Sequence, residues 1–373
     1  MNYQISEPSI LKKIIKIDQE KRLIADQSTQ HLTRWLNQDG FFLDKEAAQA
    51  YLENNFKEGT KAYHKRSSFI MNFEFYVLKY SRNGKDDRLH SIFTRMPSDL
   101  KQFVQFEGRK LIEVDITNSQ PLFLVLLLKE IRLSFDNYEK NNLTIEDVKK
   151  KVRKIINGYI NNRYRCEYYT NIDKYRIDTN KLSNNISTIL SRSSEPIDFT
   201  DVLQFEKLVK EGTIYEYIGT VLLERKSIWE TGNEYCVKLF KRNKNAQEIE
   251  KFSSLRKCAK IVMLNALYSP ANTKGLKAIN DLRKEFPNLF MVLDAIKADR
   301  SEDFPIYLQR MEAKFILDNC SKRISMENPE MLLVSRHDSL STTEDYAEVL
   351  YRKVQEMFSK YLGFDVKLQR EPW

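Results

Sequence analysis

Two short strand patterns, far apart in the sequence, each end on an aspartate. The apolar run ends at Asp115 in KLIEVDITN (residues 110–118) and at Asp338 in LLVSRHDSL (residues 332–340). Two-metal phosphoryl transfer needs two carboxylates on rigid, adjacent elements, because two Mg²⁺ ions about 3.5–4 Å apart clamp the attacking and leaving oxygens. Each aspartate alone is more often a turn residue or a helix cap. The pair therefore gains its weight from the segments around it.

A helical pattern between the two strands brings two cations and a phenol onto one face. Arg256 and Lys260 are four residues apart, and Tyr268 follows Lys260 by eight. Residues at i, i+4 and i+8 share one broad face of a helix. The cations suit a triphosphate, and the phenol suits a base or a sugar. The plain alternative is an amphipathic helix whose cations are solvated.

In this order the segments resemble the polymerase module of family A DNA polymerases and, slightly less closely, the single-subunit phage-type RNA polymerases. The strand that ends at Asp115 is similar to the first acidic motif of that superfamily. Arg256, Lys260 and Tyr268 match its pattern of Arg, three residues, Lys, seven residues and Tyr. His337-Asp338-Ser339 resembles its second acidic motif, where His-Asp is followed by Glu in DNA polymerases and often by Ser in RNA polymerases.

Two further segments extend the resemblance to roughly residues 85–345, with long gaps. Residues 88–91 (RLHS) are similar to an Arg-Leu stretch that touches the minor groove of the primer–template. Residues 308–313 (LQRMEA) are similar to the glutamine-bearing helix before the second acidic motif. Several blocks in the family's order are more specific than any one of them.

The resemblance implies a role for each matching residue. Asp115 and Asp338 would hold two Mg²⁺ ions, with Mn²⁺ as the alternative. Lys260 would act as a catalytic cation against the triphosphate, Arg256 would grip its terminal phosphate, and Tyr268 would close over the base pair or the sugar. The residues expected to contact the primer–template are Arg88, His90, Gln309 and His337.

The chain departs from the family at the residues that select the sugar. Tyr268 is followed by Ser269-Pro270, where the family usually has glycine. Five residues after Asp115, where DNA polymerases carry a glutamate that excludes the ribose 2′-hydroxyl, this chain has Gln120. Gln120 therefore joins the expected nucleotide-binding residues, and we expect relaxed sugar selection with use of both dNTPs and rNTPs.

Composition excludes several other classes of protein. The 373 residues are 42% hydrophobic and 30% charged, as in a soluble globular chain, and the net charge of +9 favours a polyanionic partner such as nucleic acid. The four cysteines and four histidines show no metal-ligand or disulfide spacing. No apolar run is long enough for a bilayer and no signal peptide is evident, so we expect a cytoplasmic location.

The patterns predict an α+β fold that is mostly helical, and the resemblance makes it a right-hand polymerase with a small antiparallel palm sheet, helical fingers and a reduced helical thumb. We expect helices over 248–268, 276–297, 303–325 and 344–361, and strands over 331–337 and 364–368. The expected domains are a helical, thumb-like region with a basic aromatic segment (1–106), palm (107–132), an inserted helical segment (133–200), fingers (201–300), and palm with a C-terminal helix (301–373).

The expected function is a template-directed DNA polymerase that adds nucleotides to a 3′-hydroxyl, with a primase-like or repair-like role in a mobile element. No acidic cluster resembles an exonuclease, so we expect no proofreading. Two alternatives stay open at this point. One is a template-independent nucleotidyltransferase, and the other is a non-catalytic nucleic-acid-binding protein on a degraded polymerase fold. The choice between DNA and RNA and the oligomeric state also stay open.

Overall fold

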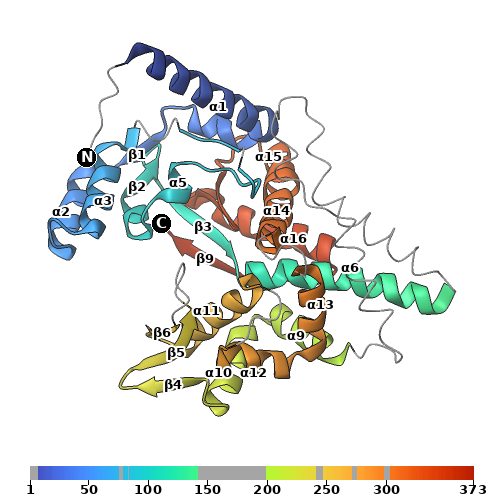
Figure 1. Ribbon diagram of the computed structural model, residues 1–373. Helices are drawn as coiled ribbons and strands as arrows, with labels where there is room; N and C mark the ends of the chain where they lie inside the picture. The colour runs from blue at the N-terminus through green and yellow to red at the C-terminus, as the bar shows by residue number, and fades with distance from the viewer. Residues whose placement is uncertain are drawn as a thin grey trace. The chain divides into compact units, whose positions relative to one another are not determined.

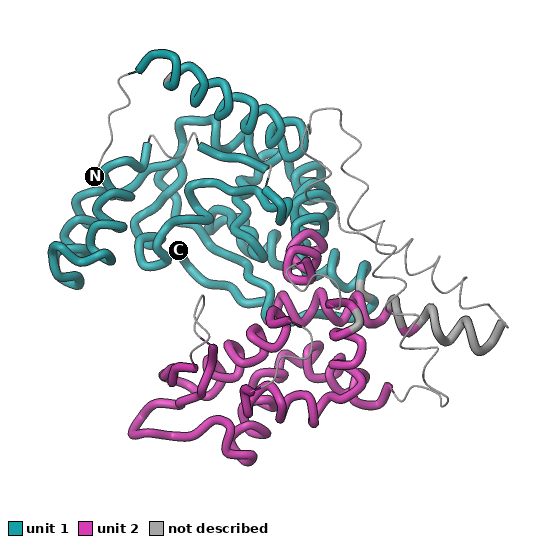
Figure 2. Tube along the Cα trace, viewed as in Figure 1, with its two compact units in different colours: residues 1–117, 312–373 teal, residues 118–311 magenta. Residues whose placement is uncertain are grey.

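The computed structural model describes residues 7–74, 79–82, 84–141, 199–240, 247–270, 275–297 and 303–373. These residues are mostly helical, with two antiparallel sheets (Figure 1). The chain divides into two compact units, unit 1 (residues 1–117 and 312–373) and unit 2 (residues 118–311) (Figure 2). The first division falls inside the range 107–132 that the sequence analysis assigned to one palm piece. Most of the expected insertion, residues 142–198, lies outside the described residues.

Unit 1 is built on a six-stranded antiparallel sheet whose central strand is β3 (Arg109–Ile116). On one side β3 pairs with β8 (Ser339–Thr343), which continues to β7 (Val334–Arg336). β3 also pairs with β9 (Leu368–Pro372) and β2 (Val104–Phe106), and β2 pairs with β1 (Phe41–Leu43). Helix α16 (Ala347–Leu362) packs on β3 and β8. The expected antiparallel sheet is therefore confirmed.

Two further helices of unit 1 begin at side chains that accept a hydrogen bond from a backbone N–H of the first turn. Asp44 accepts a hydrogen bond from Ala47 N at the start of α2 (Lys45–Asn55), and Thr60 accepts one from Tyr63 N at the start of α3 (Lys61–Met71). The other helical elements are α1 (Pro8–Leu36), α5 (Ile92–Arg95), the 3-10 helices η1 (Ser98–Phe103) and η4 (Glu344–Tyr346), and α15 (Ser321–Glu327).

Unit 2 joins a helical group to a three-stranded sheet. Its helices are α6 (Ser119–Asn141), α9 (Thr200–Lys210), α10 (Ile214–Glu224), α11 (Leu255–Tyr268), α12 (Lys277–Glu285), α13 (Pro287–Lys297) and most of α14 (Asp303–Ala313). The strands are β4 (Ile228–Thr231), β5 (Glu234–Phe240) and β6 (Gln247–Phe252). Gly212, with φ +72°, separates α9 from α10. At Gly219 a Cβ would lie 2.7 Å from Leu255 Cγ, so glycine permits the close approach of α10 to α11.

Several sequence-based elements were wrong in extent. The helix expected over 276–297 is two helices, α12 and α13, because Phe286 between them is not helical (φ −126°, ψ 63°). The strand expected over 331–337 shortens to β7. Residues 247–252 form β6 and not the start of a helix, because they pair with β5, and the helix begins only after Ser254. The expected strand at 364–368 starts at Leu368. The helical stretch 303–327 is real but divided: α14 (Asp303–Ala313) leads into a π-helix, η3 (Lys314–Cys320), before α15.

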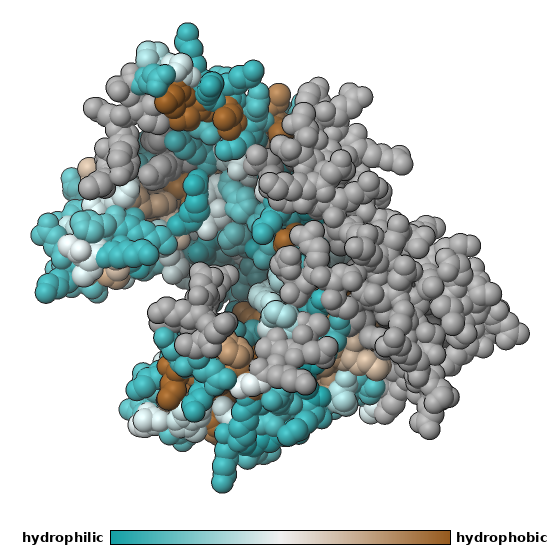
Figure 3. Space-filling view, viewed as in Figure 1, coloured by the Kyte–Doolittle hydropathy of each residue, from teal (hydrophilic) through white to brown (hydrophobic). Residues whose placement is uncertain are grey.

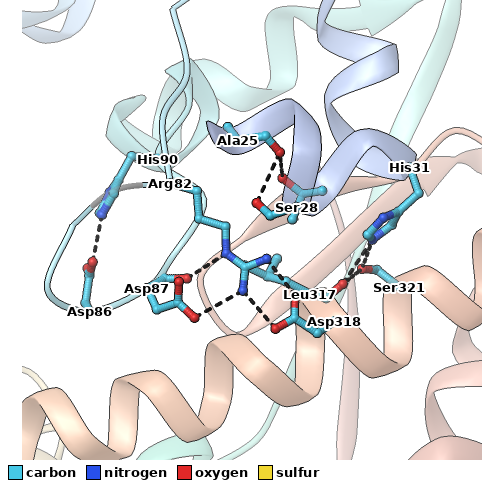
Figure 4. A network of polar contacts seen from close by, with 11 residues as sticks. Ala25, Ser28, His31, Arg82, Asp86, Asp87, His90, Leu317, Asp318 and Ser321 are labelled. Atoms are coloured by element: carbon cyan, nitrogen blue, oxygen red, sulfur yellow. Dashed lines mark hydrogen bonds and ion pairs between the residues drawn. The ribbon is translucent and has the colours of Figure 1, made fainter. Parts of the chain in front are cut away.

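A buried arginine ties the loop of residues 82–90 to the π-helix (Figure 4). Arg82 is fully buried, and its guanidinium bonds Asp318 of η3 at 2.6 and 3.1 Å. The same guanidinium donates to Asp87 O at 2.9 Å. A buried cation is tolerated only when charges and acceptors surround it, so these bonds fix the loop on η3.

His31 of α1 also bonds to the π-helix, and its titration can be tested. Its Nε2 lies 3.0 Å from Leu317 O and 2.9 Å from Ser321 Oγ, and burial lowers the pKa of His31 to about 4 (Figure 4). Between about pH 4 and 6.5 the unfolded chain binds more protons at this residue than the folded protein, so the free energy of unfolding falls as the pH falls.

None of the helices in the described part of the chain has the length and apolarity that a bilayer crossing requires.

We expect His31→Gln, which keeps a donor but cannot titrate, to lose less stability than the wild type between pH 7 and pH 4.5. The difference should be about 1–2 kcal/mol, since the partial exposure of His31 reduces the full effect of its pKa shift. Urea denaturation at each pH measures it. His64→Gln, at an exposed histidine of α3, is the control and should follow the wild type. Parallel pH profiles for wild type and His31→Gln would contradict this account.

Candidate functional site

In unit 1, the two aspartates lie on neighbouring backbone segments. β3 pairs with β8 so that Asp115 is opposite Ser339, the residue that follows Asp338. Adjacent strands run about 4.8 Å apart, so both carboxylates arise at one end of the sheet. The predicted adjacency of the two segments is confirmed. Two details were wrong: Asp338 lies on the turn between β7 and β8, after His337 with φ +58°, and the partner of β3 is β8 and not the predicted strand.

A buried polar network supports this end of the sheet. Glu113 shares a face of β3 with Asp115, because residues two apart on a strand point the same way. Its carboxylate, 5% exposed, pairs with Lys101 Nζ and accepts a hydrogen bond from Ser339 Oγ. Arg336 Nη1 lies 3.7 Å from the same carboxylate. Glu113 thus links β3 to the turn that carries Asp338. The sequence analysis missed it, although a glutamate alternating with Asp115 on an apolar strand was a visible signal.

Three of the residues expected to contact nucleic acid lie in unit 1. Arg88 Nε donates to Glu312 at 2.9 Å, and Glu312 is fully buried. His90 is bonded to Asp86 at 3.1 Å and packs edge-on against His337, with ring centroids 6.5 Å apart. Burial and the charge of Arg88 lower the pKa of His337, so its ring is neutral at neutral pH. Arg88 therefore already has a carboxylate partner. Gln309, on α14, belongs to unit 2.

In unit 2, α11 carries the expected cations. Ser254 accepts a hydrogen bond from Lys257 N and begins the helix. Arg256 pairs with Glu216, donates to Asn118 Oδ1 at 3.1 Å, and lies 5.3 Å above the Tyr215 ring. Lys260 is exposed, and its ammonium makes no ion pair with any described residue. The two cations thus differ: Arg256 is held by partners within the unit, whereas Lys260 is available to a ligand.

The two residues expected to select the sugar touch each other. Tyr268 Oη donates to Gln120 Oε1 at 2.9 Å. Tyr268 is the last residue of α11, and Gln120 lies in the first turn of α6. Gln120 and Tyr268 therefore form one hydrogen-bonded pair within unit 2.

A buried lysine that the sequence analysis missed holds the end of α11. Lys297 of α13 is 1% exposed and donates to Ala266 O at 3.0 Å, Leu267 O at 3.3 Å and Ser269 O at 3.0 Å. The last carbonyls of a helix lack intrahelical partners, and an ammonium satisfies three of them while opposing the helix dipole. Burial lowers the pKa of Lys297 to about 8. No local sequence signal separates it from a surface lysine.

The donor set of unit 1 suits a magnesium ion. Among the described residues no group of three or more His, Cys, Asp or Glu side chains could hold a metal. Mg²⁺ does not need such a cage, since it keeps several waters and takes one or two carboxylates together with substrate phosphates. Asp115 and Asp338, both half-buried, supply that number of carboxylates.

Comparisons with known proteins name no family. No family model and no curated protein matches the chain. Among the 43 solved chains that match is the POL domain of Pol1 from M. smegmatis in complex with DNA primer-template and dNTP. The two chains are 12% identical with a TM-score of 0.27, over 97% of this chain and 66% of that one. This chain thus spans a little under two thirds of that domain, and a TM-score of this size carries no argument about fold or function.

We expect Lys297→Met to destabilise the protein by about 2–3 kcal/mol, because it leaves buried carbonyls at the end of α11 without donors. Urea denaturation gives the loss, and hydrogen exchange should accelerate at the amide of Ser269, which bonds to Asn265 O. Lys207→Met removes the same atoms from a side chain that is 75% exposed and serves as the control. Equal losses in the two variants would show that Lys297 does not hold the helix.

Proposed function

We propose that this protein is a nucleotidyltransferase that adds nucleotides to a nucleic-acid 3′-hydroxyl by two-metal phosphoryl transfer. The pairing of β3 with β8 carries the proposal, because it sets Asp115 opposite the residue after Asp338. In this proposal unit 1 is a palm preceded by a reduced thumb, and unit 2 is the fingers. The proposed metal carboxylates lie in unit 1, and the side chains proposed for the triphosphate and the sugar lie in unit 2.

Asp115 and Asp338 would hold Mg²⁺, or Mn²⁺ in its place. When bound, such ions lower the pKa of the attacking hydroxyl and neutralise charge on the leaving pyrophosphate. The protein's part is to keep the two carboxylates in a fixed relation. Glu113 does this through its bond to Ser339, since the hydroxyl it holds belongs to the residue after Asp338.

The cations of α11 bind the incoming triphosphate. Lys260 provides an ammonium with no competing partner among the described residues, and it counters the negative charge that builds as the phosphoryl group is transferred. Arg256 keeps its bond to Asn118 and exchanges the half-exposed Glu216 for the terminal phosphate. Its planar fork of donors suits that bidentate exchange.

The protein makes DNA on a template, and its selection between deoxyribose and ribose is relaxed. Gln120 holds the hydroxyl of Tyr268, and the amide has both a donor and an acceptor to offer to a ribose hydroxyl. A carboxylate at this position would only accept. His90, His337 and Gln309 contact the primer–template. Arg88 does so as well once its ion pair with Glu312 is broken.

A non-catalytic nucleic-acid-binding protein on the same scaffold is the second candidate. The observation in its favour is that Arg88 and Arg256 are both paired with carboxylates within their own units. A chain that had lost catalysis would keep such arginines for structure alone. Primer extension decides between the candidates: DNA binding without incorporation, with Mg²⁺ or Mn²⁺, with dNTPs or rNTPs and with or without a template, would favour the second one.

We expect Asp115→Asn and Asp338→Asn each to slow single-nucleotide incorporation by at least about a thousandfold, because each loses a metal carboxylate. Primer–template affinity and the urea midpoint should stay close to wild type. Asp345→Asn, at a side chain that is 46% exposed on the same unit, is the control and should keep full activity. Incorporation that survives in either site variant would remove the metal-site assignment.

We expect the wild type to use rNTPs measurably beside dNTPs, and Gln120→Glu to raise the dNTP preference about tenfold, since one hydrogen bond in a polar site changes discrimination by that order. Steady-state incorporation of matched dNTP and rNTP on one template measures both. The exposed Gln204 also bonds a tyrosine, with Gln204 Nε2 2.7 Å from Tyr217 Oη, so Gln204→Glu is the control. A wild-type dNTP preference above about a thousandfold would show that selection is intact.

A further inference from the structure

Unit 1 contains a basic pocket that the proposed catalytic residues do not use. The pocket has a volume of about 470 Å³ and lies between α1 and residues 79–95. This volume is in the range of small-ligand sites. Its lining residues are Asp18, Lys21, Arg22, Lys79, Tyr80, Ser81, His90 and Arg95. Four cations therefore face a single carboxylate.

The inner wall of the pocket is fixed by hydrogen bonds. Tyr80 is 4% exposed, and its hydroxyl donates to Asp26 at 2.7 Å and accepts from Asn37 Nδ2 at 2.8 Å. Arg22 donates to Asn37 Oδ1 at 2.8 Å and lies 5.1 Å above the Tyr80 ring. Ser81 and His90 exchange two backbone hydrogen bonds of 2.8 Å each. A guanidinium held in this way loses little further side-chain freedom when it binds an anion.

Two of the four cations, Arg95 and Lys21, have no strong ion-pair partner among the described residues and can bind an anion. Arg95 is exposed and makes no ion pair or hydrogen bond with the described residues. Lys21 Nζ lies 4.0 Å from Asp18 Oδ1, a contact that is half exposed and therefore weak. A single phosphodiester carries one negative charge, which is fewer than this wall can neutralise. The pocket fits an anion with several charges.

On the face of α1 that carries Lys21, the residues beyond the pocket are apolar, while the exposed lysines Lys12, Lys13 and Lys16 lie off that face. Lys21 lies on the same helical face as Ile17, Ile14 and Ile10, at spacings of four, three and four residues. These isoleucines are 47%, 36% and 43% exposed, and brown atoms lie along α1 in Figure 3. On this face the cations are therefore grouped at the pocket, an arrangement that suits a terminal polyphosphate.

The pocket adjoins the aspartate turn of the same unit. His90 lines it and packs against His337, the residue before Asp338. A nucleotide whose phosphates occupy the pocket therefore has the carboxylate end of the sheet beside it. Two observations on unit 1, the charge and the position, point to one ligand.

We propose that this pocket binds the triphosphate of an initiating nucleotide, so that the protein starts a chain without a primer. The 3′-oxygen of the bound nucleotide attacks the α-phosphorus of a second nucleoside triphosphate. The new bond is a P–O bond, and the bond from the α-phosphorus to the bridging oxygen breaks. Pyrophosphate leaves with that electron pair, and the hydroxyl proton passes to water. The triphosphate in the pocket stays intact at the 5′ end of the dinucleotide. This proposal rests on the proposed nucleotidyltransferase function.

The test compares Lys21→Gln and Arg95→Gln with Lys16→Gln, an exposed lysine on α1 that does not line the pocket. Unprimed synthesis on a single-stranded template is started with a γ-³²P nucleoside triphosphate, whose label stays in the product only if its triphosphate survives. Each pocket variant should raise the KM for the initiating nucleotide about tenfold, the loss expected for one charge-assisted contact. Primed extension and the Lys16→Gln variant should stay within about twofold of wild type.

Binding measurements separate this inference from the function on which it rests. Calorimetry with the full chain should show ATP binding that weakens in the pocket variants and not in Lys16→Gln, whether or not any variant is active. An oligonucleotide with a 5′-triphosphate should compete with ATP if the pocket also takes the end of a chain, and a 5′-hydroxyl oligonucleotide should not. Primer extension without dinucleotide synthesis would overturn the inference and leave the proposed function standing. Pocket variants that lower duplex affinity with a shallower salt slope, and leave ATP binding unchanged, would identify backbone contacts and overturn it as well.

Discussion

The pairing of β3 with β8 is the constraint on which the candidate chemistry depends. A slip of one residue in this register would turn Asp115 to the opposite face of the sheet. The buried Glu113 opposes such a slip, because its carboxylate is satisfied only when Lys101 and Ser339 both reach it. Breaking one partner of a buried charged group costs about 3–5 kcal/mol, far more than a surface pair contributes. The same contact that fixes the strand register therefore fixes the turn that carries Asp338.

Each unit combines side chains that are held with side chains that are left available. In unit 1, Arg82 is buried on Asp318 and fixes the loop that carries His90. In unit 2, Lys297 holds the end of α11, while Lys260 on the same helix stays exposed without a partner among the described residues. Held groups lose no freedom when a ligand binds, and available charges supply the attraction.

The sequence alone determined the features that depend on short-range periodicity. Strand alternation located β3 and most of β7, and the helical spacing of apolar residues located α16. It also placed two cations and a phenol on one face of α11, since that face depends only on 3.6 residues per turn. Periodicity did not locate the ends of helices and strands. Residues 247–252 have a charged pattern that fits an exposed helix as well as an exposed edge strand, and only pairing with β5 distinguishes the two.

Tertiary structure decided which polar groups are buried and what they touch. Lys297 meets carbonyls about thirty residues earlier in the chain, and Arg82 meets an aspartate 236 residues later. Glu113 bonds a serine 226 residues away. No local pattern encodes such partners, because the cost of burying a charge is set by whatever surrounds it after folding. Asp115, Asp338, Lys260 and Tyr268 are therefore expected from the resemblance of their segments, while the buried residues that contact those segments became visible only in the folded chain.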